Sequence, residues 1–209
     1  MDTSDLPRYY LSDYQAFVKR SFDLLLAFIG LFFTWPFILL TWVIASFDTR
    51  SNGIFFQKRV GRNGRLFWLV KIKTMRRSND ITTSITRSND PRITSLGCFL
   101  RNYKLDELPQ LWNVFWGDMS FVGPRPDVPG FADCLEGGAR AVLSIRPGIT
   151  GPATLKYRNE EVLLAARQNP EAFNRDVIWP DKVHINLDYI KNWSLRRDIQ
   201  YILRSVEIR

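Results

Sequence analysis

The chain has 209 residues, of which 45% are hydrophobic, and its net charge of +8 favours an anionic partner such as nucleic acid, a phosphorylated small molecule or an acidic membrane surface. Its length suits one domain, or one domain with an appended segment. Two cysteines are too few for a disulfide framework or a thiolate metal site, and a single histidine excludes most histidine-based chemistry. Catalysis would therefore depend on carboxylates, Lys or Arg, and a hard cation.

The first predicted element is an apolar membrane segment. Residues 24–47, LLLAFIGLFFTWPFILLTWVIASF, carry no charge, and this length is enough to cross a bilayer, which takes ~20 apolar residues. Residues 1–21 before it mix aromatic side chains with charges, as is typical of an interfacial lead-in. A cleaved secretory signal is disfavoured, because the apolar run is too long and acidic residues precede it.

The path of this segment depends on its charges and on one proline. Basic residues flank both ends of the run, although they favour the cytoplasmic side of a membrane. Pro36 lies in the middle, where it removes a backbone hydrogen bond and kinks the helix. A re-entrant helix that bends at Pro36 and returns to the face it entered accounts for both features. A straight spanning helix is the alternative, because such helices also tolerate proline.

A basic hairpin is predicted next. Residues 49–79 contain nine Lys or Arg and no acidic residue, and two strand-like runs flank Asn63-Gly64, a dipeptide favoured in tight hairpin turns. The second run should place apolar side chains on one face and cations on the other: Trp68, Val70 and Ile72 opposite Leu69, Lys71 and Lys73. The hairpin can contact anionic lipid headgroups, or some of Arg59, Lys71 and Lys73 can bind phosphate.

A polar loop and a short helix lead to the centre of the chain. Residues 78–89, SNDITTSITRSN, have the composition of a loop. Thr94 or Ser95 is predicted to cap an amphipathic helix that runs through Tyr103. Its apolar and basic side chains suit a helix lying at a membrane interface.

The central stretch is residues 101–126, RNYKLDELPQLWNVFWGDMSFVGPRP. Asp106 and Glu107 come just before Pro109, and proline suits a first helical turn because its missing N–H would be unpaired there. A short helix ending near Gly117 is predicted by apolar residues at helical spacing: Leu108, Leu111, Trp112, Phe115 and Trp116. The pair would lie at the helix N-terminus, where the helix dipole keeps a carboxylate ionised. Taken alone, it fits a helix cap better than a catalytic centre.

Two loops rich in glycine and proline each present one arginine. Arg125 lies in residues 117–126, and Arg146 begins RPGITG at 146–151. A rigid loop with a guanidinium suits phosphate or nucleotide recognition, because arginine offers a planar fork of donors. A plain turn whose arginine pairs with a carboxylate is the alternative. Ser194 is predicted to cap a last amphipathic helix. Together the elements predict an α+β fold that is mainly helical, with a Pro-broken membrane helix, interfacial helices and a small β-hairpin.

An ordered set of motifs runs through the chain: KRSFD at 19–23, the Pro-broken apolar run, FFQKRVGRNGRLF at 55–67, DPRIT at 90–94, LDELPQLWNVFWGDMSFVGPRP at 105–126 and RPGITG at 146–151. This set resembles the bacterial sugar transferase family, the monotopic phosphoglycosyl transferases that begin cell-envelope glycan assembly. The likeness runs from about Lys19 to Gly151 and is weaker beyond. The chain is similar to the small members that consist of the catalytic domain alone.

The resemblance implies a two-step reaction. Asp106 would attack the sugar-bearing phosphorus of a nucleoside-diphosphate sugar, commonly a UDP-sugar, and release the nucleoside monophosphate. Polyprenyl phosphate would then attack the sugar-phosphoryl aspartate. Glu107 would engage Mg²⁺ or position the phosphates, with Asp106 as the other candidate metal ligand. Arg125 would recognise the nucleotide, and Arg101 and Arg146 would contact phosphate. No role is assigned to residues after Gly151.

The resemblance also implies a location. Pro36 would be the break of a re-entrant helix, so that both helix ends lie at the cytoplasmic face of the bacterial inner membrane. Residues 1–48 would form the membrane part and residues 49–209 the catalytic domain. The expected partners are the nucleotide-sugar donor, polyprenyl phosphate and the lipid bilayer, without nucleic acid. Two alternatives stay open: a non-enzymatic basic anchor that binds acidic lipid or nucleic acid, and a nucleotide-sugar hydrolase.

Overall fold

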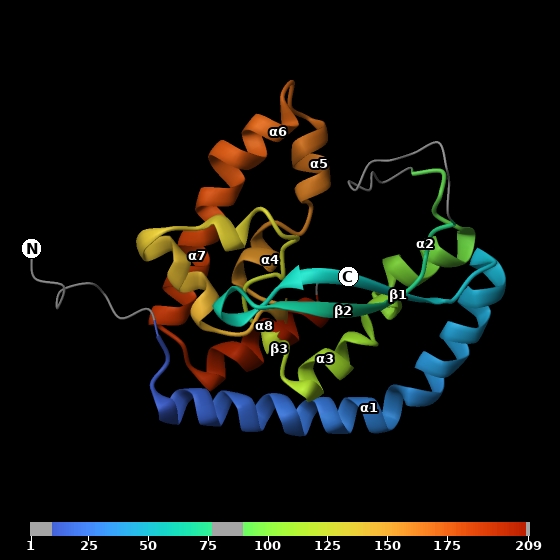
Figure 1. Ribbon diagram of the computed structural model, residues 1–209, viewed down its shortest axis with the longest axis horizontal. Coiled ribbons are helices and arrows are strands. Elements are labelled where there is room, and N and C mark those ends of the chain that lie inside the picture. The colour runs from blue at the N-terminus through green and yellow to red at the C-terminus, as the bar shows by residue number, and fades with distance from the viewer. Residues whose placement is uncertain (1–9, 77–89, 208–209) are drawn as a thin grey trace, which may run out of the picture.

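A computed structural model describes residues 10–76 and 90–207, in which helices dominate and two small sheets accompany them (Figure 1). The α-helices are α1 Asp13–Thr49, α2 Ser95–Asn102, α3 Gln110–Trp116, α4 Pro152–Lys156, α5 Glu160–Ala165, α6 Pro170–Phe173, α7 Trp179–Lys191 and α8 Leu195–Glu207. The strands are β1 Ile54–Val60, β2 Leu66–Ile72, β3 Ser120–Val122 and β4 Gly148–Thr150. The prediction of a mainly helical fold with a small hairpin is confirmed. The predicted loop at 78–89 lies outside the described residues.

Helix α1 begins with a capping box and contains Pro36. The Ser12 hydroxyl accepts from the Gln15 amide, and the Gln15 side chain accepts from the Ser12 amide. The helix is long and apolar enough to cross a membrane, and only 11% of its most apolar window is buried, unlike the core helix of a soluble protein. Figure 1 shows α1 running along the base of the molecule and then bending upward. Such a bend is what proline produces in a helix, while the re-entrant path stays a prediction.

Both parts of α1 pack against the rest of the described chain. Ala27 is fully buried in a cluster that includes Val114 of α3. Ala45, beyond the bend, is fully buried in a second cluster with Leu100 of α2. Alanine at these two positions lets the neighbouring elements approach the helix axis closely. The bent helix therefore contacts α3 with one part and α2 with the other.

The β-hairpin has the predicted turn. Strands β1 and β2 pair antiparallel, with Ile54 opposite Ile72 and Val60 opposite Leu66. Asn63 and Gly64 both adopt left-handed backbone, with φ of 59° and 78°. Turns of this hand match the twist of two antiparallel strands, which is why this dipeptide is favoured in hairpins.

The packing of β2 differs in part from the predicted one, because Ile72 is buried as expected but the opposite face is buried as well. Phe67 and Leu69 are 9% and 2% exposed, whereas Trp68 is 55% exposed. Phe67 and Leu69 pack in the cluster that contains Ala27 and residues of α3, so the packing of two helices decides which face is buried. Lys71 follows Leu69 at a spacing of two and lies on this inner face.

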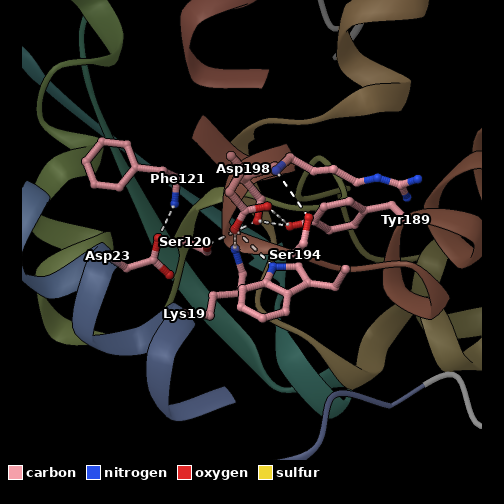
Figure 2. Close-up of polar contacts among 10 residues, drawn as sticks. Lys19, Asp23, Ser120, Phe121, Tyr189, Ser194 and Asp198 are labelled. Carbon is pink, nitrogen blue, oxygen red and sulfur yellow. Dashed lines mark hydrogen bonds and ion pairs between the residues drawn. The ribbon is translucent and has the colours of Figure 1, made fainter. Parts of the chain in front are cut away.

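Three charged residues in one stretch of α1 bind three other elements, and the first is Lys19. Its ammonium lies 2.6 Å from Oδ2 of Asp198 in α8, with both side chains buried (Figure 2). The same carboxylate accepts hydrogen bonds from the Tyr189 hydroxyl at 2.6 Å and the Trp193 indole at 3.0 Å. The buried charges are thus paired and hydrogen-bonded, which offsets much of their desolvation cost.

The other two residues are Arg20 and Asp23. Asp23 accepts a hydrogen bond of 3.1 Å from the backbone amide of Phe121 in β3 (Figure 2). Arg20 donates to the carbonyls of Val114 and Phe115, at 2.7 and 2.8 Å, near the C-terminal end of α3. Helix α1 is therefore joined to α3, β3 and α8 by polar contacts within residues 19–23.

Substitution of Asp198 by Ala is expected to destabilise the fold strongly. Lys19 would keep a buried charge without its counter-ion, which costs roughly 3–5 kcal/mol and lowers the midpoint of thermal unfolding by about 10 °C. Thermal unfolding in detergent measures this shift. Asp176→Ala is the matched control, because its ion pair with Arg175 is exposed, and it should change the midpoint by about 2 °C at most. Equal shifts in the two variants would contradict the expectation.

Candidate active site

Asp106 and Glu107 lie in a short 3-10 turn, Leu105–Glu107, that connects α2 to α3. Lys104, the residue before this turn, has a left-handed backbone with φ of 57°, so the chain changes direction after α2. Helix α3 begins only at Gln110, after Pro109 at the N-cap. The sequence placed the pair at the N-terminus of this helix, whereas in the structure the pair lies in a separate turn just before it.

Glu107 is held by two cations. Its Oε1 lies 2.8 Å from Nζ of Lys71 and 3.6 Å from a guanidinium nitrogen of Arg125. Burial on its own raises the pKa of Glu107, but the charges of Lys71 and Arg125 outweigh it and bring the pKa to about 2. Glu107 is therefore ionised at neutral pH.

Asp106 has a different environment although it is the next residue in the chain. It is 8% exposed, and its Oδ1 is buried with no hydrogen-bond partner in the described part of the chain. Burial raises its pKa, the charge of Glu107 raises it further, and Lys71 and Arg101 act in the opposite direction. The helix dipole was expected to favour the ionised form of Asp106, whereas its environment raises the pKa, with burial as the largest cause.

Four of the predicted cations lie around the acidic pair. Lys71 and Arg125 contact Glu107, as above. Arg59 of β1 donates to the Pro126 carbonyl at 3.1 Å, next to Arg125, and its pKa is lowered by burial and by the Arg125 charge. Arg101 donates to the Thr74 hydroxyl at 2.8 Å, on the Asp106 side. These four residues surround the acidic pair.

Arg146 lies away from the acidic pair. Its Nε donates to the Gly117 carbonyl at 2.7 Å, at the C-terminal end of α3, while the pair lies before the N-terminal end. The pKa of Arg146 is lowered by burial and by the neighbouring charge of Arg20. The structure thus places Arg146 with Arg20, which binds carbonyls at the same end of α3.

A cleft of about 830 Å³ opens beside Glu107. Lys104, Glu107 and Arg125 line it, together with residues of α4 and α7. Asp106 is not among the lining residues, so the cleft reaches only one carboxylate of the pair. Asp127, also in the lining, has its pKa raised to about 6 by burial, against the lowering charges of Lys182 and Arg59.

Residues 14–209 match the model of the family described as bacterial sugar transferase. The chain belongs to this family. It is 32% identical over 204 residues to the exopolysaccharide production protein ExoY of Sinorhizobium fredii, an alignment that covers 90% of this chain and 83% of that protein. It is also 32% identical to the undecaprenyl-phosphate galactose phosphotransferase of Salmonella typhimurium, across 92% of this chain and 40% of that protein.

A further relative is the UDP-glucose:undecaprenyl-phosphate glucose-1-phosphate transferase of Xanthomonas campestris, 35% identical over 91% of this chain and 38% of that protein. The chain therefore has the size of the catalytic domain of the longer relatives, and it is a phosphoglycosyl transferase. This membership supports an enzyme rather than a non-enzymatic basic anchor. The family resemblance seen in the ordered motifs is confirmed.

The transferase has a carboxylate pair that suits Mg²⁺. Magnesium commonly takes one or two carboxylates and completes its coordination with water and substrate phosphates. The unpartnered buried Oδ1 of Asp106, beside Glu107, fits that requirement. Within residues 10–76 and 90–207, no group of three or more His, Cys, Asp or Glu side chains gathers. Asp106 and Glu107 are thus the candidate ligands.

Sequence reasoning missed the part of the transferase's cleft that α4 and α7 form. Thr154, Lys182 and Asn186 line it, and all three follow Gly151, where motif resemblance is weak. Asp127 was also missed, although it directly follows the Pro-Arg-Pro motif. Its position beside a recognised loop was the only local signal.

Replacement of Asp106 by Asn is expected to stabilise the transferase at neutral pH. The pKa of Asp106 is higher in the folded than in the unfolded state, so its ionisation disfavours folding above pH 3.8 and has no effect at lower pH, where both states are protonated. The unfolding midpoint should rise by about 2–4 °C at pH 7, the shift that ~1 kcal/mol gives.

Thermal unfolding at pH 7 and near pH 3 tests this expectation, because the gain should vanish at the lower pH. Asp176→Asn is the control, since hydrogen bonds from Arg175 lower the pKa of that exposed carboxyl and no gain is expected. A loss of stability in Asp106→Asn at pH 7 would contradict the burial argument.

Proposed function

We propose that the transferase moves a sugar 1-phosphate from a nucleoside-diphosphate sugar to polyprenyl phosphate. The donor that we expect is a UDP-sugar. The names of two relatives support this: one acts on undecaprenyl phosphate and galactose, the other on UDP-glucose and undecaprenyl phosphate. The observation that supports the proposal most directly is the acidic pair. Asp106 has an unpartnered carboxylate oxygen, while Lys71 and Arg125 bind Glu107. The product would start envelope glycan assembly.

The reaction would proceed through a covalent intermediate on Asp106. A carboxylate oxygen of Asp106 forms a bond to the phosphorus that bears the sugar, and the bond from this phosphorus to the bridging oxygen breaks. The nucleoside monophosphate leaves with that electron pair. An oxygen of polyprenyl phosphate then bonds to the same phosphorus, the bond to Asp106 breaks, and the carboxylate is restored. The attacking phosphate oxygen is already ionised, so no proton has to be removed from it.

The environment of the pair supports this division of roles. A carboxylate with a raised pKa is a more basic nucleophile, and burial raises the pKa of Asp106. Arg125 is 52% exposed at the cleft, so its guanidinium is accessible to a phosphate group. Arg101 and Lys71 lie close enough to Asp106 to affect its pKa and offset charge that develops there. Bound Mg²⁺, held by Asp106 and Glu107, would neutralise the diphosphate.

We also propose that α1 anchors the transferase in the bacterial inner membrane, with residues 49–209 at the cytoplasmic face. Most of its apolar window is exposed, as a lipid-facing helix requires. Trp112 and Trp116 of α3 are 43% and 73% exposed, and tryptophan is enriched at membrane interfaces. Because α3 directly follows the acidic pair, this arrangement would hold the pair near the lipid acceptor. Residues 1–48, with the break at Pro36, would be the re-entrant part.

The activity is tested by incubating the transferase with Mg²⁺, undecaprenyl phosphate and single UDP-sugars, and measuring UMP. We expect one or a few donors to release UMP, and Asp106→Asn to lower the rate at least about 10³-fold, because a lost nucleophile has no substitute. Asp176→Asn, an exposed carboxylate, should keep the wild-type rate. Turnover that persists in Asp106→Asn would exclude Asp106 as the nucleophile.

The hydrolase alternative is separated by leaving out undecaprenyl phosphate. A covalent intermediate then predicts a single burst of about one UMP per active site, whereas a hydrolase continues to release UMP. Quenched-flow measurement of UMP gives the size of the burst. Continued release at the full rate without lipid would favour hydrolysis.

The re-entrant path is tested by labelling two single cysteines from outside intact cells. Cys98 and Cys134 are exposed and are first replaced by Ser. Tyr10→Cys and Leu66→Cys, at exposed positions before and after α1, should both resist an impermeant reagent until the cells are opened. Labelling of only one of them in intact cells would demonstrate a straight span.

A further inference from the structure

Two polar side chains in the cleft have buried oxygen atoms without partners. Oδ1 of Asn186 in α7 and Oγ1 of Thr154 in α4 have no hydrogen-bond partner among residues 10–76 and 90–207. Asn186 is 6% exposed, and both residues line the cleft that Glu107 and Arg125 also line. Buried polar atoms are normally hydrogen-bonded, so each of these exceptions calls for a ligand or another physical reason.

Packing does not supply that reason. Helix α7 is anchored by Tyr189 and Ile190, which are buried in a cluster with Val122 and Trp193. An apolar side chain of similar size at position 186 would fill the same space without leaving a buried acceptor unsatisfied. The unpartnered amide oxygen of Asn186 thus costs stability, and a ligand that donates a hydrogen bond to it would remove this cost.

The cation that lies next to Asn186 on helix α7 is already paired. Lys182 lies one helical turn before Asn186, and its ammonium is 2.6 Å from the Glu160 carboxylate. The cleft lining thus offers guanidiniums, at Arg125 and Arg158, and neutral hydrogen-bonding groups, at Asn186 and Thr154. The neutral groups suit an uncharged part of a ligand.

We propose that Asn186 and Thr154 form a subsite for the uncharged part of the donor, and that this subsite selects which nucleotide sugar is used. The inference rests on the proposed function, which assigns the diphosphate to the portion near Arg125. Asn186 Oδ1 only accepts, so its ligand must donate an O–H or N–H, whereas the Thr154 hydroxyl can donate or accept. The nucleoside and the sugar both carry such donors.

The experiment compares Asn186→Leu and Thr154→Val with the wild type in the UMP-release assay. Each variant should raise KM for the UDP-sugar about tenfold, with a smaller effect on kcat, because a ground-state hydrogen bond is lost. Thermal unfolding midpoints should not fall, since each change removes a buried unsatisfied oxygen. Asn192→Leu is the matched control: it removes an amide just after α7, outside the cleft lining, and should leave KM unchanged.

Inhibition by UMP identifies the group that the subsite holds. If it holds the nucleoside, Asn186→Leu raises the inhibition constant of UMP by the same factor as KM. If it holds the sugar, UMP inhibits as in the wild type and the ranking of UDP-sugars changes instead. Either result supports the subsite, and the near-isosteric Thr154→Val keeps the test valid should Asn186→Leu fold poorly.

The inference is overturned if both variants keep KM within about twofold and the donor ranking of an active wild type. The proposed function would then still stand, because the wild type releases UMP. Failure of the wild type with every donor is a different result, which removes the proposed function and the subsite together.

Discussion

The buried carboxylate of Asp198 is the contact on which the arrangement of the helices depends. It joins Lys19 of α1 to Tyr189 and Trp193, and so connects the first described helix to the last two. Most of the apolar window of α1 is exposed, and apolar contacts alone allow a helix to slide or rotate against its neighbours. A buried ion pair with directional hydrogen bonds permits only one register, because any displacement leaves a charge desolvated and unpaired.

The position of α1 also determines the position of the acidic pair, through contacts with α3. Arg20 binds carbonyls near the C-terminal end of α3, and Arg146 binds Gly117 at the same end. Both guanidiniums complement the partial negative charge of a helix C-terminus. The 3-10 turn with Asp106 lies before the other end, so the position of the pair relative to α1 is determined by contacts at the opposite end of a short, rigid helix. Arg146 was expected to contact phosphate, but in the structure it makes this contact with the Gly117 carbonyl.

Local features could be predicted from the sequence, and features set by tertiary packing could not. The Asn63-Gly64 turn and the Thr94 cap depend on one residue and its immediate backbone, and both are found. The burial of Phe67 and Leu69 in β2 was not predicted, because the packing of α1 and α3 rather than the strand decides it. A helix dipole was expected to favour the ionised form of Asp106, whereas burial, which depends on tertiary packing, raises its pKa. No role was assigned to Asn186, since no pattern reveals a missing partner.

The two adjacent carboxylates differ in pKa because the nearby cations contact them unequally. Lys71 and Arg125 both reach Glu107, so Glu107 stays ionised and its charge helps to raise the pKa of Asp106. Of the two cations, Lys71 lies 2.8 Å from Glu107 with its side chain 19% exposed, whereas Arg125 lies at 3.6 Å and is 52% exposed. The longer, more solvated contact contributes less. Arg125 can therefore turn to an incoming phosphate while Lys71 still neutralises Glu107, so a substrate can bind without leaving a buried carboxylate unpaired.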